Sequence, residues 1–285
     1  MTTVRAVRLT AEARRRLRRT RGKGRVHSAF ARTINIELDG LGEAGWLSLH
    51  GPGPIPSPFG IACEAPPALA GQAGVPVRFQ PGQLVVDGLL DVRLDDAVAE
   101  DTSVPTAALP PSIAPCLAAA APTVTDGLLP VAAALLTGAV APSTPLASLA
   151  APALARLHDT TAVGDAAGCL AAALPLLGLG PGLTPSGDDC VLGWLVGARV
   201  GPPMGRGLAE RAGPMLLAAA AERTGALSRA FLAAAVEGHV AELLHRFVTA
   251  PDDARLAGLL ALGETSGADL LAGYLVAWHA LAGSG

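Results

Sequence analysis

The chain has 285 residues, of which 51% are hydrophobic, 16% charged and 3% aromatic, and its net charge is −3. This length allows one or two domains, whose cores must consist of small and aliphatic side chains. The four cysteines form no C-x-x-C pair, which argues against a zinc knuckle or a disulfide framework and favours a reducing, cytoplasmic compartment. Residues 127–155 are uncharged but interrupted by prolines, so no membrane span is expected.

Basic side chains gather at the N-terminus. The first 32 residues hold eleven of the 21 Lys and Arg residues and a single acidic residue, Glu12. Such a segment binds nucleic acid, an anionic lipid surface or an acidic partner, or else it is a solvated helix face or a disordered tail. Few aromatic residues accompany the arginines and no nucleic-acid-binding motif follows, so nucleic acid is not the favoured partner. We interpret residues 1–25 as a basic arm, either disordered or helical from Thr10.

Strand-like patterns follow the basic arm. Residues 33–38 and 46–50 alternate between polar and apolar side chains, and 75–79 and 83–87 are short apolar runs. Clusters of Gly, Pro and Asp separate them, as expected for turns. The pattern predicts a β-rich domain over residues 26–104, built as a small antiparallel sheet or a barrel.

Helical patterns take over beyond a proline-rich connector at 105–122 and continue to the end. The predicted fold class is therefore α+β, with a small β-rich N-terminal part followed by an α-helical bundle over residues 105–285. Gly and Pro separate the expected helices, which lie near 127–140, 147–158, 163–178, 188–200, 205–222, 226–248, 252–263 and 267–283.

A glycine-rich loop, Gly178-Leu-Gly-Pro-Gly-Leu-Thr-Pro-Ser-Gly-Asp-Asp189, opens one of these helices. The unpaired N–H groups of a helix N-terminus attract phosphate or carboxylate. Gly180, Gly182 and Gly187 let the backbone approach such a ligand, and Thr184 and Ser186 add hydroxyl donors. The spacing is not that of a P-loop and no lysine follows, so a nucleoside triphosphatase is not favoured.

Asp188 and Asp189 are the candidate catalytic residues, although an anionic ligand would be repelled by them. One aspartate caps the helix while the other binds Mg²⁺ that bridges to the ligand, or an aspartate orients or deprotonates a nitrogen nucleophile. The structural explanation is capping alone, because Asp is common in the first turn of helices. The sequence leaves these alternatives, and with them the identity of any metal, open.

The motif Ser-Gly-x-Asp-x-x-x-Gly occurs twice, from Ser186 to Gly193 and from Ser266 to Gly273. Both copies open an apolar helix. The repetition adds Ser266, Gly267 and Asp269 to the candidate ligand-binding residues, although Asp269 taken singly is an ordinary helix cap.

Two hydroxyl residues, Thr224 and Ser228, lie four residues apart on one helix face. They either bind a ligand or serve as a helix cap and a back-bonded serine. Further along, His239 and Glu242 share a face without the spacing of a zinc-binding H-E-x-x-H motif, so no zinc site is predicted.

These motifs resemble the family of uncharacterised domains that includes AllH, a subunit associated with oxamate carbamoyltransferase in anaerobic allantoin breakdown. The resemblance rests on the glycine-rich loop, on Thr224-x-x-x-Ser228 and on Glu264-Thr-Ser-Gly-Ala-Asp269-x-x-x-Gly273. His27-Ser28-Ala-Phe30, Asn35 and the Gly51-Pro52 loop are similar to its N-terminal part, so roughly residues 25–283 are covered. Cys190 and Ala268 depart from the bulkier apolar residues often found there, and the arginine arm is not part of the pattern.

The resemblance implies transfer of a carbamoyl group between carbamoyl phosphate and an amide such as oxamate, within an assembly of several subunits. On this hypothesis the loop holds phosphate, Asp188 or Asp189 orients the attacking amide, and Ser266 contacts a second anion. Two rival hypotheses remain. One is a Mg²⁺-dependent hydrolase in which Asp188, Asp189 and Asp269 converge, and the other is a non-catalytic ligand-binding or scaffold subunit.

Overall fold

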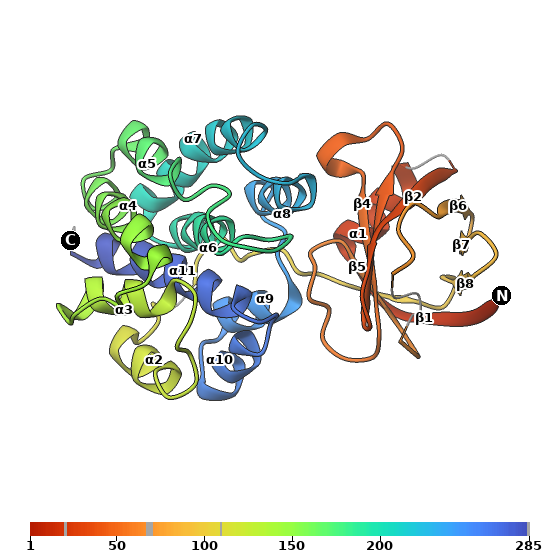
Figure 1. Ribbon diagram of the computed structural model, residues 1–285, viewed down its shortest axis with the longest axis horizontal. Helices are drawn as coiled ribbons and strands as arrows, with labels where there is room; N and C mark the ends of the chain where they lie inside the picture. The colour runs from red at the N-terminus through yellow and green to blue at the C-terminus, as the bar shows by residue number, and fades with distance from the viewer. Residues whose placement is uncertain (20–21, 67–70, 109, 284–285) are drawn as a thin grey trace. The chain divides into compact units, whose positions relative to one another are not determined.

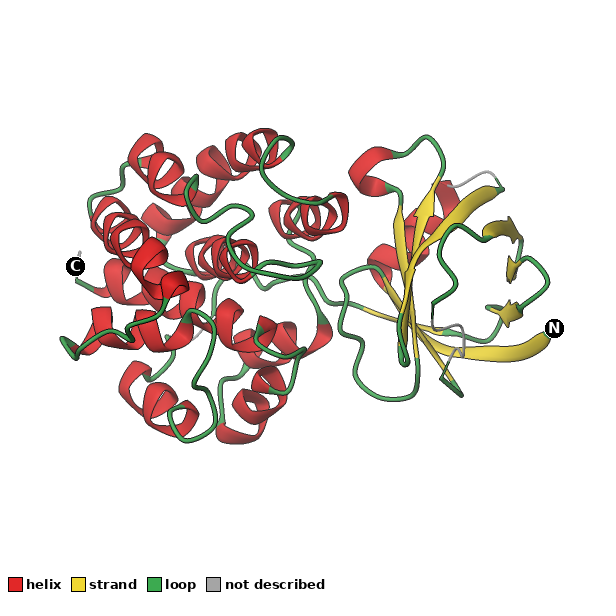
Figure 2. Cartoon of the chain, in the orientation of Figure 1, coloured by secondary structure: helices red, strands yellow, loops and turns green. Residues whose placement is uncertain are grey.

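The structure is a computed structural model that describes residues 1–19, 22–66, 71–108 and 110–283. Residues 20–21 of the basic segment and residue 109 of the connector lie outside the described residues. The chain divides into two compact units, one β-rich and one helical (Figures 1 and 2). The β-rich unit comprises Met1–Ser103 with His239–Glu242, and the helical unit comprises Val104–Gly238 with Leu243–Gly285.

The β-rich unit is one sheet that closes on itself. The described strands run in the order β5-β4-β3-β2-β6-β7-β8-β1-β9, and an additional pairing of β5 with β1 closes β1 to β8 into a barrel. The α+β class is therefore confirmed, with a closed barrel as its β part. The elements of this unit are β1 (Thr2–Thr10), α1 (Ala11–Arg19), β2 (Lys23–Ala29), β3 (Thr33–Leu38), η1 (Gly42–Ala44), β4 (Trp46–His50), β5 (Gly60–Cys63), β6 (Pro76–Gln80), β7 (Gln83–Val86), β8 (Leu90–Arg93) and β9 (Val98–Glu100).

Alternation in β3 and β4 builds the barrel core. Ile34 lies opposite Leu49 and Ile36 opposite Leu47 in the antiparallel register, and all four side chains belong to the buried apolar cluster. Since successive side chains of a strand point to opposite faces, the residues between them line the other face of the sheet. The sequence pattern therefore determined which face of these two strands is apolar.

The N-terminal segment is not a separate arm. Strand β1 pairs antiparallel with β5 and parallel with β8 and β9, and Val4 and Ala6 on it are buried. In α1, buried Arg16 pairs with buried Glu12 at 2.6 Å between Nε and Oε1. The interpretation of this segment as an arm was therefore wrong, whereas the alternative of a helix from Thr10 agrees with α1. The buried side chains of β1 were not recognised as a strand pattern because Arg5 and Arg8 lie among them.

Buried His50 makes the β-rich unit sensitive to acid. Its Nδ1 lies 3.1 Å from Thr33 Oγ1, and burial lowers the pKa of the ring from 6.5 to about 3. Between about pH 6.5 and 3 the ring is protonated in the unfolded chain but neutral in the folded chain. The free energy of unfolding therefore decreases as the pH falls through this range. Between pH 7.5 and 4.5 we expect His50 alone to remove unfolding free energy on the order of 2 kcal/mol.

The His50→Asn variant tests this prediction because asparagine does not titrate and keeps a polar group beside Thr33. Urea unfolding at pH 7.5 and 4.5 should show a loss of unfolding free energy that is smaller than in the wild type by an amount on the order of 2 kcal/mol. The Thr33→Val variant is the control, since it leaves the titrating ring in place and should keep the full loss. Equal pH dependence in His50→Asn and the wild type would contradict the assignment.

The helical unit is arranged around two central helices, α6 and α11 (Figure 1). Nearly every residue of both helices is buried, as expected for segments that are apolar on all sides. None of the described helices combines the length and apolar character needed to cross a membrane. The helices of this region are α2 (Ile113–Ala120), α3 (Leu129–Thr137), α4 (Pro145–Ala162), α5 (Ala166–Ala173), α6 (Ser186–Val200), α7 (Pro203–Ala220), α8 (Ala226–Val236), α9 (Glu242–Thr249), α10 (Asp253–Leu260) and α11 (Ser266–Ala282).

Two helical predictions differ from the structure. The connector contains the short helix α2, and the single helix predicted over 226–248 is divided into α8 and α9. Gly238, with φ of +86°, follows the end of α8. The chain then joins the β-rich unit, where Val240 donates to the Thr102 carbonyl at 3.2 Å. Glycine in the left-handed region ends a helix without strain, which explains the break.

Candidate functional site

The glycine-rich loop lies between α5 and α6 and has a left-handed backbone at Gly180 and Gly182, with φ of +114° and +97°. These values are strained for other residues, so the two glycines are required by the path of the loop. Within the described part of the chain, no hydrogen bond is formed by five of its backbone N–H groups. They belong to Gly180, Gly182, Leu183, Thr184 and Ser186. The loop therefore presents a series of backbone donors close to the N-terminus of a buried helix.

Asp188 ties three segments together. Its carboxylate accepts hydrogen bonds from the Gly178 N–H at 2.8 Å and from the Ser228 hydroxyl at 2.7 Å, and also from the Thr224 hydroxyl. The side chain is 2% exposed. Three donors on one buried carboxylate fix the start of the loop and the start of α8 to α6. Thr224 and Ser228 thus lie at the site, but their hydroxyls donate to Asp188.

Asp189 and Asp269 open the two central helices and are 5% and 0% exposed. One oxygen of Asp269 accepts a hydrogen bond from the Leu128 N–H at 2.5 Å. The Oδ2 atoms of both aspartates are buried and have no hydrogen-bond partner among the described residues. Buried polar atoms without a partner are uncommon in proteins, so these two oxygens need an explanation.

Burial raises the pKa of both carboxyl groups. For Asp189 the rise is large, and the charges of Asp269 and Asp188 add to it, while the hydroxyls of Ser266 and Thr184 oppose it. For Asp269 the Leu128 N–H and the Ser186 hydroxyl oppose the effect of burial. The serine of each motif thus affects the pKa of the aspartate in the other motif.

The two copies of the motif are equivalent in structure as well as in sequence. Gly187 donates to the Leu179 carbonyl at 2.8 Å, and Gly267 donates to the Leu262 carbonyl at 2.9 Å. A Cβ atom on Gly187 would lie 1.9 Å from the Leu176 carbonyl oxygen, and one on Gly267 1.8 Å from that of Leu259. Both glycines therefore pack against backbone. The pattern Leu-x-x-Leu-Gly, which precedes each serine, is a sequence signal of this repeat that the shorter motif leaves out.

Later glycines of the motif bring α6 and α11 into contact. A Cβ atom on Gly193 would lie 1.9 Å from the Leu270 carbonyl oxygen, and one on Gly273 would lie 1.8 Å from that of Cys190. The backbones of the two helices therefore touch at this crossing. The same crossing brings the two N-termini together, with Thr184 Oγ1 3.4 Å from Ser266 Oγ although 82 residues separate them.

Two arginines flank the loop and were not among the predicted site residues. Arg223 donates to the Leu174 carbonyl at 3.4 Å, and Arg229 donates to the Thr224 carbonyl at 3.0 Å. The carbonyl of Arg223 also adjoins Gly178, where a Cβ atom would lie 2.1 Å from it. These two side chains place positive charge beside the Leu174 and Thr224 carbonyls.

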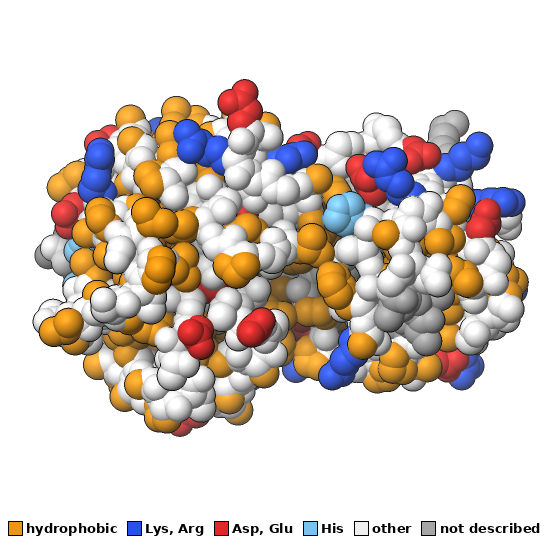
Figure 3. Space-filling view, viewed as in Figure 1, with side chains coloured by type: hydrophobic (Ala, Val, Ile, Leu, Met, Phe, Trp, Pro, Cys, Tyr) orange, Lys and Arg blue, Asp and Glu red, His pale blue; other side chains and the backbone are white. Residues whose placement is uncertain are grey.

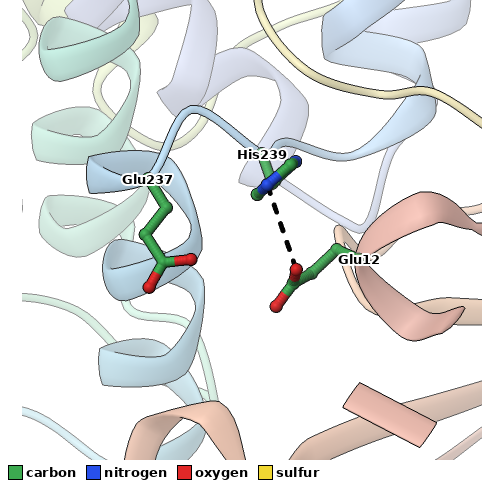
Figure 4. A group of neighbouring side chains, drawn as sticks. All are labelled: Glu12, Glu237 and His239. Atoms are coloured by element: carbon green, nitrogen blue, oxygen red, sulfur yellow. Dashed lines mark ion pairs between the residues drawn. The ribbon is translucent and has the colours of Figure 1, made fainter. Parts of the chain in front are cut away.

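Glu12 and Glu242, two acids of the β-rich unit, are already engaged. In the β-rich unit, Glu12 accepts from Arg15 at 2.5 Å and from Arg16 at 2.6 Å, and His239 lies 3.9 Å from it (Figure 4). Glu242 accepts from the Ile55 N–H at 2.7 Å and from Arg8. Because arginine already neutralises these acids, neither offers the free carboxylate of a zinc site.

The rival dinuclear site would require Asp188, Asp189 and Asp269 to converge. Among the described residues, these three do not form a group whose ligand atoms all lie within 4.8 Å of one another. Asp188 also accepts three hydrogen bonds, so its oxygens are occupied. The geometry therefore does not favour a three-aspartate hydrolase site.

The protein is thus an α+β protein of two units. One unit is a β-barrel, and the other is a helical unit whose core helices start at a glycine-rich polar site. A family model described as oxamate carbamoyltransferase subunit AllH matches residues 176–278, and one described as the AllH family N-terminal domain matches residues 5–100. These regions cover more than half of the chain, which belongs to the AllH family. Comparison with curated proteins and with solved structures gave no match.

Proposed function

We propose that this chain binds a small anion, carbamoyl phosphate or a carboxylate, as a subunit of an oxamate-type carbamoyltransferase in purine (allantoin) catabolism. The family, described as a subunit of oxamate carbamoyltransferase, supports the association with such an enzyme. The five unpartnered backbone N–H groups of the loop carry the proposal of anion binding. Partner subunits and a cytoplasmic location are part of the same proposal.

In this proposal Gly180 and Gly182 present backbone N–H groups to phosphate, while Thr184 and Ser186 add hydroxyl donors. Asp188 is a positioning residue, because its oxygens already accept three hydrogen bonds. Asp189 retains an unpartnered oxygen and is the better candidate to orient the amide nitrogen. Ser266, at the start of α11, contacts the carboxylate of the second substrate.

The proposed reaction is carbamoyl transfer. The amide nitrogen attacks the carbonyl carbon of carbamoyl phosphate, the bond from that carbon to the phosphate oxygen breaks, and phosphate leaves while the nitrogen loses a proton. Backbone donors that hold the phosphate stabilise it as negative charge develops on the leaving oxygen. Reconstitution with partner subunits distinguishes a reaction that occurs wholly on this chain from one that is shared between subunits.

Calorimetric titration of the purified chain with carbamoyl phosphate, with and without Mg²⁺, tests the proposal. We expect saturable binding. The single variants Thr184→Val and Ser186→Ala should each weaken it about tenfold, since each removes one hydrogen bond to a charged group. Ser148→Ala is the matched control, because that hydroxyl is exposed on α4 and donates to the Thr144 carbonyl. Absence of binding under both conditions would overturn the proposal for the isolated subunit.

Turnover separates the transferase from a non-catalytic ligand-binding subunit. Carbamoyl transfer from carbamoyl phosphate to oxamate should require this chain when it is mixed with its partner subunits, and Asp189→Asn should lower kcat more than it raises KM. Ligand binding without turnover in every combination of subunits would assign the chain to the non-catalytic alternative.

A further inference from the structure

We propose that Asp189 and Asp269 together bind one hard divalent cation, such as Mg²⁺, between the first turns of α6 and α11. This site goes beyond the anion-binding function proposed above, with which it shares Asp189, Thr184, Ser186 and Ser266, and it is tested in the absence of any anionic ligand. Asp188, whose oxygens accept the Gly178 N–H and two hydroxyl donors, takes no part.

The unpartnered oxygens are the main observation. Asp189 is 5% exposed and Asp269 is fully buried, and each leaves its Oδ2 atom without a hydrogen-bond partner among the described residues. The charge of Asp269 acts on Asp189 across the helix crossing, so the two carboxyl groups lie within electrostatic reach of each other. A cation that contacts both oxygens would satisfy two buried acceptors at once.

Protonation is the alternative explanation. A proton on each carboxyl group would neutralise its charge without a cation, and the metal titration below distinguishes the two cases. No Lys, Arg or His is among the groups that act on either carboxyl group. The described part of the chain therefore places no cationic side chain beside these two carboxyl groups, whereas buried carboxylates are normally paired with a cation or coordinate a metal.

The donor atoms indicate the type of cation. The hydroxyls of Ser266 and Thr184 act on Asp189 and the hydroxyl of Ser186 acts on Asp269, while the buried thiol of Cys190 also lies within electrostatic reach of both aspartates. A donor set of carboxylates and hydroxyls suits Mg²⁺, Mn²⁺ or Ca²⁺. Mg²⁺ is commonly held by one or two carboxylates and completed by water or phosphate.

An acidic cavity lies next to the start of α11. A cavity of about 500 Å³ adjoins the start of α11 and is lined by Thr265 and Ala268, which flank Ser266 and Asp269 in sequence. Asp126, Asp253 and Glu264 also line it. Acidic side chains are visible over α2 and α10 on the face drawn in Figure 3. A cavity lined by one sign of charge raises the local concentration of the opposite ion.

Titration with Mn²⁺ followed by electron paramagnetic resonance tests the proposal on the full chain, with no phosphate or carboxylate ligand present. We expect one saturable Mn²⁺ site that Mg²⁺ displaces. Asp189→Asn and Asp269→Asn should each weaken binding at least about tenfold. Asp159→Asn, at an exposed position on α4, is the matched control and should bind as the wild type does.

Folding of the variants is controlled directly. Asparagine at 269 keeps the oxygen that accepts the Leu128 N–H, and circular dichroism in metal-free buffer shows whether the helices persist. Ser266→Ala provides a milder variant that should weaken Mn²⁺ binding without removing a carboxylate. The proposal is overturned if the wild type shows no saturable Mn²⁺ binding at millimolar concentration, or if both aspartate variants bind as tightly as the wild type.

The two proposals fail separately. Loss of Mn²⁺ binding with retained carbamoyl-phosphate binding would remove only the cation site. Retained Mn²⁺ binding with no response to carbamoyl phosphate would remove only the anion site.

Discussion

Gly273→Ala is expected to destabilise the helical unit by about 3 kcal/mol or more, a large loss of stability for a single added methyl group. The new Cβ atom would lie 1.8 Å from the Cys190 carbonyl oxygen and 2.6 Å from the Trp194 nitrogen. Both are backbone atoms of α6, so no side-chain rotation relieves the clash, and the two central helices must separate. Urea unfolding followed by circular dichroism measures the loss.

The control is Gly258→Ala in α10. A Cβ atom at this position would meet only Leu243 Cδ2, at 3.5 Å, which is an ordinary van der Waals contact. Because alanine favours helix more than glycine does, this variant should be as stable as the wild type or about 0.5–1 kcal/mol more stable. Gly273→Ala with wild-type stability would show that α6 and α11 do not cross at backbone contact.

The second large effect is expected for Asp188→Ala. The substitution leaves the Gly178 N–H and the hydroxyls of Thr224 and Ser228 without their acceptor. Unpaired buried donors cost about 1–3 kcal/mol each, so we expect a loss of about 3 kcal/mol or more in unfolding free energy. Since the start of the loop is then no longer held to α6, carbamoyl-phosphate binding should be lost as well.

Asp188→Asn is the graded variant, because its amide oxygen still accepts one donor, and it should lose less stability than Asp188→Ala. Asp159→Ala, at an exposed position, should change stability by less than about 0.5 kcal/mol. If Asp188→Ala unfolded with the wild-type midpoint and still bound carbamoyl phosphate, the positioning role of Asp188 would be refuted.

Much of the fold was predictable from local pattern. The alternation of residues 33–38 and 46–50 predicted two strands that the structure confirms as β3 and β4. The glycine-rich loop, Thr224-x-x-x-Ser228 and the second Ser-Gly-x-Asp motif identified the AllH family, which the family models confirm. The prediction that residues of these motifs form a ligand site remains to be tested by the titrations above.

Other features escaped local pattern because they depend on distant partners. Strand β1 reads as an arginine-rich arm, and only its pairing with β5, β8 and β9 makes it part of a barrel. The helical pattern over 226–248 continues across Gly238, and the break depends on a neighbouring segment, since Val240 donates to the Thr102 carbonyl. The hydrophobic periodicity of a segment indicates which face of the helix or strand is apolar, but it does not indicate which other element packs against that face.

Local sequence pattern was sufficient for the α+β class, the strand faces of the barrel core, the family and the two helix starts that carry Ser-Gly-x-Asp. The role of each aspartate, in contrast, follows from the tertiary arrangement. The Asp188 carboxylate accepts three hydrogen bonds, whereas Asp189 and Asp269 each have one buried oxygen without a partner among the described residues. The sequence can show that an aspartate lies in the first turn of a helix, because capping is local. The burial of Asp189 and Asp269, and the effect of Ser266 and Ser186 on their pKa, depend on the close crossing of α6 and α11 at Gly193 and Gly273.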